Sequence, residues 1–407
     1  MKNKKEIAYI IKPLFAPLKE SELEEIIALA QSAGANVYGY KTQLVKQIVP
    51  ATLIGSGKLE EIRFELEDSP VNLIIFDGDL TSSQAMNISE ILGGRKVIDR
   101  TALILDIFAL NAKSTEGKLQ VELAQLNYLY PRLKGKGSAL SQQGAGIGTR
   151  GPGETALETN RRYLRGRIHF LKERLKEIEA RRKLQSDRRK KNEVRTVALV
   201  GYTNTGKSTL LNALTDAGVE TKNQLFATLD PTLRKTEIEQ FPVVFADTVG
   251  FIRNIPHDLV EAFRSTLESA VNADLILIVC DAKADWEMQL KTTQDTLRSL
   301  NCDASMLIVF NKCDGIEDFS VFPKDAIFIS ALTGAGLNEL KEKLIRYFQE
   351  RFITATLSIP YAEFKIVQSI RESATVLRER YVDSGIELEV SAEKKYWEKI
   401  KPFVIEK

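Results

Sequence analysis

The stretch Gly201-Tyr202-Thr203-Asn204-Thr205-Gly206-Lys207-Ser208 fits the pattern G-x-x-x-x-G-K-[ST]. An apolar segment predicted as a strand, residues 194–200, precedes it, and a helical pattern over residues 209–214 follows it. In a strand–loop–helix context, backbone N–H groups of such a loop form an anion-binding nest at the helix N-terminus. The stretch therefore predicts a phosphate-binding loop inside an α/β domain with a doubly wound, mainly parallel sheet.

Two side chains of this loop have separate predicted roles. Lys207 supplies a positive charge for the β- and γ-phosphates, which also makes it a candidate catalytic residue. Ser208 offers its hydroxyl to Mg²⁺. We expect Thr209, the next residue along the helix, to complete the phosphate site.

The segment Asn311-Lys312-Cys313-Asp314 follows the strand predicted at residues 306–310 and indicates guanine as the base. The Asp314 carboxylate can accept hydrogen bonds from N1–H and the 2-amino group of guanine. Adenine has an acceptor at N1 and lacks the 2-amino group, so it would leave a buried carboxylate facing a lone pair, which is costly. Lys312 can lie over the base plane, and Asn311 can tie this segment to the phosphate loop. The segment Ser330-Ala331-Leu332, after the strand predicted at residues 326–329, offers a backbone N–H to guanine O6.

Two further segments are predicted to respond to the γ-phosphate of GTP. Asp247-Thr248-Val249-Gly250 follows the strand predicted at residues 243–246. There Asp247 can reach Mg²⁺ through water, and the Gly250 N–H, a candidate catalytic group, can approach the γ-phosphate. Phe226-Ala227-Thr228-Leu229-Asp230 resembles a first switch. Thr228 would add its hydroxyl to Mg²⁺ and its backbone to the γ-phosphate, which makes it a candidate metal ligand and catalytic residue. Thr232 is the alternative for this role.

The residue after Gly250 bears on hydrolysis. Ras-like GTPases have a Gln there that orients the attacking water. This chain has Phe251 and then Ile252, and neither side chain can hydrogen-bond to water. We therefore expect slow turnover of the protein alone, raised by a partner. Asn204 resembles an Asn of GTPases that use K⁺ in place of an arginine finger, which would make it catalytic and K⁺ a cofactor. The alternative is that Asn204 supports the fold of its loop.

Composition excludes several other classes of site. With only two histidines, a histidine-based catalytic or zinc site is not expected. Cys280, Cys302 and Cys313 are an odd number without metal-binding spacing and are expected to be reduced. No apolar run reaches the roughly 18 residues that span a membrane. Because the N-terminus also lacks a secretory signal pattern, a cytoplasmic location without integral membrane association is expected.

The pattern of predicted elements divides the 407 residues into four parts. Strands and helices alternate over residues 1–100, which predicts a small, mainly parallel α/β unit. Residues 101–193 predict a helical hairpin: a helical stretch to residue 130, a Gly/Arg-rich loop at 131–154, and a charged helix from residue 158. Residues 194–351 form the domain that carries the phosphate loop. Residues 352–407 predict a small α+β domain whose clearest helix covers 365–377.

Basic charge is concentrated in the hairpin. Residues 161–195 hold 15 Lys/Arg against 5 Asp/Glu, a net charge of 15 − 5 = +10, whereas the whole chain carries +2. Such a segment favours a polyanionic partner, the alternative being a solvated helical linker. The loop before it is rich in glycine and basic residues, so we expect it to be disordered in solution and to order on RNA. The candidate RNA contacts are Arg132, Lys134, Lys136, Gly144, Gly146, Gly148 and Arg150.

One short segment admits two interpretations. Ile54-Gly55-Ser56-Gly57-Lys58 repeats the glycine, lysine and helix start of a nucleotide site but lacks the full spacing of a phosphate loop. The turn at a helix N-terminus is the favoured interpretation over a second nucleotide site, because short glycine motifs are weak signals.

The chain resembles the HflX family of ribosome-associated, translation-factor-related GTPases over nearly its full length. The phosphate loop and Asn-Lys-Cys-Asp indicate only a GTPase, and Cys313 departs from the aliphatic residue usual there. Its side chain is not the one that reads guanine. More specific are Asp99-Arg100-Thr101, Glu116-Gly117-Lys118-Leu119-Gln120-Val121-Glu122-Leu123-Ala124-Gln125-Leu126, Arg150-Gly151-Pro152-Gly153-Glu154, the first-switch segment, and Asp247-Thr248-Val249-Gly250-Phe251-Ile252.

This resemblance implies a monomer that binds the large ribosomal subunit and splits stalled or idle ribosomes under stress. It also implies that the Gly/Arg loop points toward the peptidyl-transferase region, and DNA is not an expected partner. The alternative is a GTP-gated RNA-binding or ribosome-assembly factor. A regulatory switch at a membrane surface is disfavoured because the chain lacks a lipidation motif and a clear amphipathic anchor. An RNA-modifying enzyme is disfavoured because no catalytic constellation occurs outside the nucleotide site.

Overall fold

The computed structural model describes residues 6–141, 152–191, 195–215, 225–226, 232–239, 241–253 and 271–406. Contacts divide the chain into two compact units. The N-terminal unit comprises residues 1–178 together with 222–230 and 249–267, and the C-terminal unit comprises the remainder. Two segments from the middle of the sequence therefore pack with the N-terminal unit.

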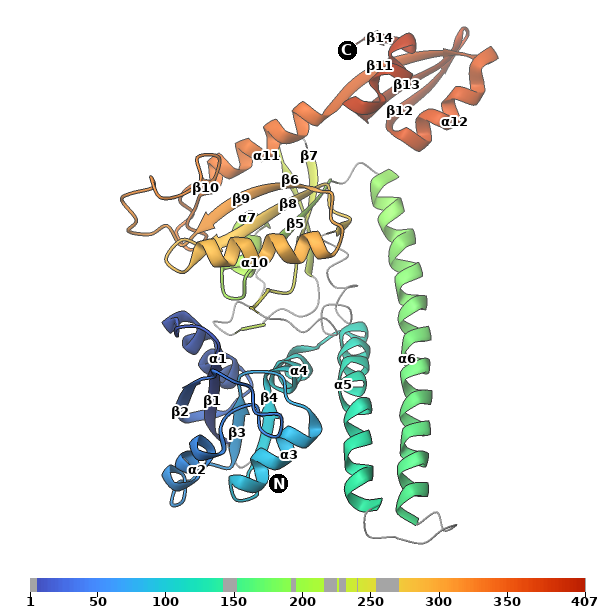
Figure 1. The fold of residues 1–407 in the computed structure, drawn as a ribbon. Coiled ribbons are helices and arrows are strands. Elements are labelled where there is room, and N and C mark those ends of the chain that lie inside the picture. The colour runs from blue at the N-terminus through green and yellow to red at the C-terminus, as the bar shows by residue number, and fades with distance from the viewer. Residues whose placement is uncertain are drawn as a thin grey trace. The chain divides into compact units, whose positions relative to one another are not determined.

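A four-stranded parallel sheet forms the centre of the N-terminal unit (Figure 1). Its strands have the order β2-β1-β3-β4, and helices α1, α2 and α3 connect them. The α/β alternation predicted for residues 1–100 is confirmed. The bounds are β1 Ile7–Leu14, α1 Glu20–Ser32, β2 Asn36–Leu44, α2 Ser56–Glu65, β3 Leu73–Phe76, α3 Ser82–Ile91 and β4 Lys96–Asp99. Fully buried side chains of these elements, Tyr9, Leu59, Ile62, Phe76 and Ile88 among them, build one apolar core.

Three long helices follow the sheet: α4 Arg100–Asn111, α5 Thr115–Ser141 and α6 Pro152–Lys191. The start of α4 is fixed by Asp99, whose side chain accepts a hydrogen bond from the Ala102 N–H at 2.8 Å. Helix α6 begins at Pro152, a position where the missing N–H of proline costs nothing.

The predicted start of the Gly/Arg loop at residue 131 is wrong, because α5 continues through Pro131 to Ser141. Contacts on both sides of the proline hold the helical path. The Tyr128 hydroxyl and the Arg132 guanidinium both donate to Asp99, each at 2.8 Å, and the Ser82 hydroxyl donates to the Arg132 carbonyl at 3.1 Å. These anchors offset the hydrogen bond that a proline removes from a helix. Residues 142–151 lie outside the described part of the chain.

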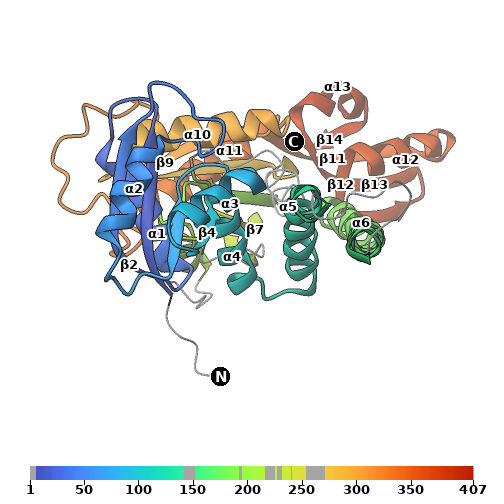
Figure 2. The same cartoon turned by 60° about the horizontal axis from the view of Figure 1, so that its bottom comes forward.

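Helices α5 and α6 lie side by side, as the hairpin prediction required (Figures 1 and 2). Arg167 of α6 pairs with both carboxylate oxygens of Glu122 at 2.6 and 2.8 Å, and Arg165 donates to the Tyr130 hydroxyl at 2.8 Å. The predicted apolar seam of α6 faces inward: Leu171 is fully buried, and its neighbours on the seam are partly buried. Those neighbours are Leu164, Ile168, Leu175 and Ile178.

The C-terminal unit contains a six-stranded sheet of order β10-β9-β8-β5-β7-β6, in which only β6 runs antiparallel to its neighbour. This confirms the predicted mainly parallel sheet. The bounds are β5 Arg195–Gly201, α7 Lys207–Thr215, β6 Thr232–Ile238, β7 Phe241–Asp247, β8 Leu275–Asp281, α10 Trp286–Ser299, β9 Ser305–Asn311, β10 Ile327–Phe328 and α11 Leu337–Arg351. Strands β5, β7, β8 and β9 end at the same edge, where the loops of the site begin.

An antiparallel sheet of order β12-β13-β11-β14 completes the chain. Its elements are β11 Phe352–Pro360, α12 Phe364–Ser373, β12 Ala374–Val382, β13 Gly385–Glu393, α13 Trp397–Ile400 and β14 Val404–Glu406. The small α+β domain is thus present, but the helix predicted at 365–377 ends at Ser373. The next residues pair with β13 instead, Val376 opposite Val390, because strand pairing buries β-branched side chains well.

Packing between α5 and α6 predicts the effect of one substitution. Leu171→Ala should lower the free energy of unfolding by about 2–5 kcal/mol, since it leaves a cavity in a closely packed seam. Leu184→Ala is the matched control, because Leu184 is 64% exposed on the same helix and should change stability by no more than about 0.5 kcal/mol. Urea unfolding followed by circular dichroism measures both. Equal effects of the two substitutions would contradict the packing described here.

Candidate nucleotide site

The phosphate loop leaves β5 at Gly201 and enters α7 at Lys207. Neighbouring groups require glycine at both glycine positions of the motif. A Cβ atom on Gly201 would lie 2.2 Å from the Val279 carbonyl oxygen, and one on Gly206 would lie 2.3 Å from the side-chain nitrogen of Asn311. Gly206 also has φ of +89°, a conformation that L side chains rarely adopt. The loop can therefore pack this closely against Val279 and Asn311 only with glycine at positions 201 and 206.

Lys207 lies inside the loop. Its ammonium donates to the carbonyl oxygens of Tyr202 at 2.7 Å and Gly201 at 3.1 Å. Burial lowers the pKa of Lys207 to about 8, although the Asp247 charge acts in the opposite direction. A polyanion bound by the loop would favour the charged form of this lysine.

Ser208 and Asp247 bring two oxygen ligands together. The Ser208 hydroxyl, in the first turn of α7, donates to Asp247 Oδ2 at 2.6 Å, and Asp247 is fully buried at the end of β7. Hard divalent cations such as Mg²⁺ prefer hydroxyl and carboxylate oxygens. The residues at this edge of the sheet therefore fit the predicted magnesium site.

Asn311 connects the segment 311–314 to two other loops. Its side-chain nitrogen donates to the Thr205 carbonyl and its side-chain oxygen accepts from the Ala331 N–H, both at 2.9 Å. One buried amide thus joins the phosphate loop, the end of β9 and the segment 330–332. The Ala331 N–H already donates to the Asn311 side chain. The side chain of the next residue, Leu332, is exposed.

The residues on either side of Cys313 are oriented by polar contacts. Lys312 donates to the Asn204 carbonyl at 2.8 Å and to Asp281 Oδ2 at 2.6 Å. A hydrogen bond from the Ser330 side chain lowers the pKa of Asp314, so this carboxyl is held in its charged, accepting form. The Cys313 thiol donates to the Phe310 carbonyl at 3.3 Å.

Asp281 is a site residue that the sequence analysis missed. It ends β8, the strand between β5 and β9, and it pairs with Lys312. Its position at the carboxyl end of an apolar strand, next to the strands that carry the other motifs, was the available signal.

The backbone of Asn204 bears on its two interpretations. Asn204 has φ of +62°, a left-handed conformation that asparagine tolerates better than most residues. Its carbonyl also accepts the bond from Lys312. Both observations favour support of the loop's fold, and the role of Asn204 in binding K⁺ stays a prediction.

Some of the predicted switch residues lie outside the described ranges, and others lie in β6 or belong to the N-terminal unit. Ala227, Thr228, Leu229 and Asp230 are outside them. Thr232, the alternative to Thr228, is the first residue of β6 and pairs with Asp247. Phe226, Val249, Gly250 and Phe251 pack with the N-terminal unit, and the Phe251 side chain is buried.

The candidate RNA contacts fall into three groups. Arg132 donates to Asp99 and to the Leu80 carbonyl, and its guanidinium stacks on the Tyr128 ring at 3.4 Å, so it is engaged within its own unit. Lys134 and Lys136 lie on α5 beyond the residues whose side chains are described. Gly144, Gly146, Gly148 and Arg150 lie outside the described ranges, and their contacts with RNA stay predictions.

The segment 54–58 has a defined local structure. Gly55 precedes α2, which begins at Ser56, so the segment 54–58 forms the predicted helix start. In the described ranges, no group of three His, Cys, Asp or Glu side chains is arranged to hold a metal ion. No helix in this part of the chain has the length and hydropathy needed to cross a membrane.

Three family models match consecutive parts of the chain. They are described as "GTP-binding GTPase N-terminal" for residues 20–109, "GTP-binding GTPase Middle Region" for residues 111–189 and "50S ribosome-binding GTPase" for residues 196–312. Among solved structures, one titled "crystal structure of SsGBP and GDP complex" is 26% identical with a TM-score of 0.48, covering 84% of this chain and 98% of that chain.

Curated relatives match nearly the whole length. A "GTPase HflX" of Caldanaerobacter subterraneus subsp. tengcongensis is 44% identical over 404 residues, which cover 98% of this chain and 94% of the relative. A "GTPase HflX" of Escherichia coli is 40% identical over 394 residues, which cover 93% of this chain and 92% of the relative. With these matches and the nucleotide site described above, the chain belongs to the HflX family of GTPases and is a GTP hydrolase.

Proposed function

We propose that this GTPase binds the large ribosomal subunit and uses GTP to split stalled or idle ribosomes under stress. The observation that carries the proposal is the helical hairpin, whose helices end at the glycine- and arginine-rich residues. Its α6 helix contributes most of the charge of the +10 segment, residues 161–195. The match to a family described as "50S ribosome-binding GTPase" supports the same partner.

The proposed nucleotide contacts follow from the positions of the site residues. Lys207 and the N–H groups of the phosphate loop bind the phosphates, and Ser208 and Thr228 bind Mg²⁺, with Asp247 acting through water. When bound, Mg²⁺ neutralises charge that develops on the phosphate oxygens. Asp314 binds N1–H and the 2-amino group of guanine, with its carboxylate oriented by Ser330.

Hydrolysis in this proposal depends on the partner. Gly250 directs its N–H to the γ-phosphate, but the side chains of Phe251 and Ile252 cannot orient a water molecule. The ribosome therefore supplies or positions the group that completes the reaction, with K⁺ bound by Asn204 as a further contributor. Release of the γ-phosphate then frees the switch segments and ends the binding event.

Base recognition can be tested by Asp314→Asn. The amide loses one acceptor and gains a donor, so GTP affinity should fall by about 10- to 1000-fold, the cost of losing one or two hydrogen bonds to a charged group. Affinity for xanthosine triphosphate, which has a carbonyl in place of the 2-amino group, should rise. Fluorescent-nucleotide titration measures both. The control is Asp318→Asn, because Asp318 lies close in sequence and accepts hydrogen bonds from the backbone N–H and the side chain of Ser320. Unchanged GTP affinity of the Asp314 variant would exclude the proposed contact.

Ribosome splitting can be tested on sucrose gradients. We expect intact ribosomes to separate into subunits when incubated with the protein and GTP, but not with ATP. Deletion of residues 144–148 should abolish splitting and leave GTP binding unchanged, because the deleted residues lie far in sequence from the nucleotide motifs. Splitting by the deletion variant would refute the role of the loop. Co-sedimentation with precursor particles and no splitting of mature ribosomes would favour the GTP-gated assembly factor.

A further inference from the structure

The last two residues of D-x-x-G and the three that follow, residues 249–253, belong to the N-terminal unit. The Arg253 guanidinium pairs with Glu22 at 3.0 Å and donates to the Ser21 hydroxyl at 3.0 Å, both at the start of α1. The Arg253 carbonyl accepts a hydrogen bond from Arg100 at 3.1 Å. Side chain and backbone of this one residue are thus both anchored.

Arg253 completes a charge cluster, defined here as Lys12, Glu22, Glu25, Asp77, Arg100 and Arg253. Arg100 pairs with Asp77 at 2.7 Å and with Glu25, and Lys12 pairs with Asp77 at 2.6 Å and with Glu22 at 3.5 Å. Three cations balance three carboxylates when Arg253 is in place. Burial raises the pKa of Glu25, which shows that an excess of negative charge would be costly here.

Phe226, the first residue of the first-switch segment, and Leu225 before it contact the same helices. The Leu225 N–H donates to the Ser32 hydroxyl at the end of α1, at 3.1 Å. The Phe226 ring lies edge-on to the Phe108 ring of α4, with 4.7 Å between centroids. Helices α1 and α4 therefore contact Leu225 and Phe226 at the start of one predicted switch and Arg253 just after the other.

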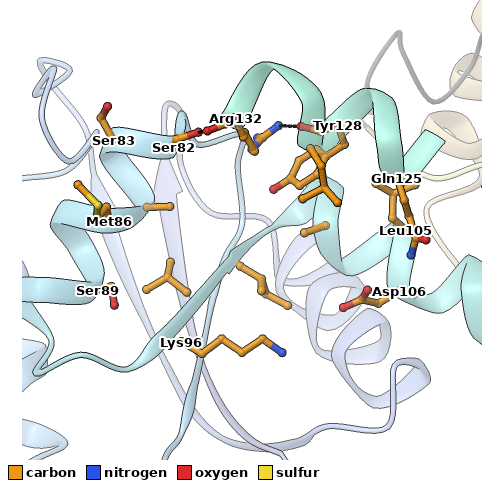
Figure 3. A pocket seen from close by; sticks show the side chains of 15 residues that line it. Ser82, Ser83, Met86, Ser89, Lys96, Leu105, Asp106, Gln125, Tyr128 and Arg132 are labelled. Atoms are coloured by element: carbon orange, nitrogen blue, oxygen red, sulfur yellow. Dashed lines mark hydrogen bonds between the residues drawn. The ribbon is translucent and has the colours of Figure 1, made fainter. Parts of the chain in front are cut away.

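The residue before Arg100 faces the hairpin instead. Asp99 accepts from the Tyr128 hydroxyl and the Arg132 guanidinium of α5, each at 2.8 Å. In Figure 3, Arg132 and Tyr128 lie together where α5 meets Ser82 of α3. Two adjacent residues at the start of α4 thus contact different elements: Arg100 contacts Arg253, just after D-x-x-G, and Asp99 contacts α5.

A pocket beside this contact gives α5 room to shift. It has a volume of about 670 Å³ and lies between α3, β4, α4 and α5. Met86, Leu105 and Gln125 line it (Figure 3), together with Leu129. Helices in closely packed cores move little. Since the pocket leaves fewer side chains packed against this face of α5, packing opposes a shift of the helix least on this side.

We propose that Asp99 and Arg100 are positioning residues that couple the nucleotide-responsive segments to the helical hairpin. The segment 249–253 is the element with two states, since the γ-phosphate draws such segments to one position and release frees them. Any change that moves Arg253 alters the charge cluster and, through Arg100, the start of α4. Asp99, the residue next to Arg100, then changes its contacts with α5. By linkage, a partner that binds the hairpin must then change nucleotide binding by the same factor. The inference rests on the proposed function for the identity of that partner only.

Hydrogen exchange on the full chain without ribosomes tests the coupling. Exchange of the α5 backbone amides is compared between protein saturated with GDP and protein saturated with a non-hydrolysable GTP analogue. We expect rates to differ by about fivefold or more, the lower end of ordinary allosteric coupling. Glu22→Gln and Arg253→Ala should remove this difference while both nucleotides still bind, and Arg253→Lys should restore part of it.

The matched control is Glu61→Gln, which neutralises a carboxylate of the same unit that pairs with Lys41 and Lys58, away from the cluster. This variant should keep the nucleotide-dependent difference. The coupling is refuted if wild-type α5 exchanges equally with both nucleotides, or if Glu22→Gln behaves like Glu61→Gln. Because ribosomes are absent from the experiment, failure of ribosome splitting would leave its outcome unaffected.

Discussion

The side-chain amide of Asn311 is the interaction on which the nucleotide site depends. Two hydrogen bonds of 2.9 Å join it to Thr205 in the phosphate loop and to Ala331 in the loop after β10. It reaches the phosphate loop only because Gly206 has no side chain in its path. Parallel strands bring the starts of these loops to one edge of the sheet, and the amide then fixes their spacing. The loop predicted to bind phosphate and the segment predicted to read the base are therefore joined through one side chain.

Buried charge marks the two places where the protein is expected to respond to its nucleotide. Lys207 is held by carbonyl groups of its own loop, and its lowered pKa shows the cost of its burial. In the N-terminal unit, Arg253 balances the carboxylates of the charge cluster. Since unpaired buried charges are costly, both places favour a defined arrangement of charge partners over intermediate ones.

The sequence allowed prediction of most of the fold and of which segments meet at one edge of the six-stranded sheet. Apolar strands and glycine motifs act locally, so residues such as Gly201 and Asn311 could be assigned from their neighbours in the chain. Asp281 was missed because its role depends on a strand adjacent in space to β9.

The wrong predictions also arise from contacts between residues that are far apart in the sequence. Pro131 is a helix breaker by local rules, yet contacts of Tyr128 and Arg132 with Asp99 keep α5 helical. The end of the helix predicted at 365–377 was set by pairing with β13 rather than by helical periodicity. The packing of Arg253 on α1 could not be predicted either, since more than 200 residues separate it from Glu22. Long-range contacts override local propensity in each case.

We propose that this chain positions GTP but relies on the ribosome to complete hydrolysis. Steady-state GTP turnover, measured with and without purified large ribosomal subunits, tests it most directly. We expect slow turnover of the protein alone and a rise of about tenfold or more with subunits, which lowers the activation barrier by about 1.4 kcal/mol. Fast turnover of the isolated protein that large subunits leave unchanged would contradict it.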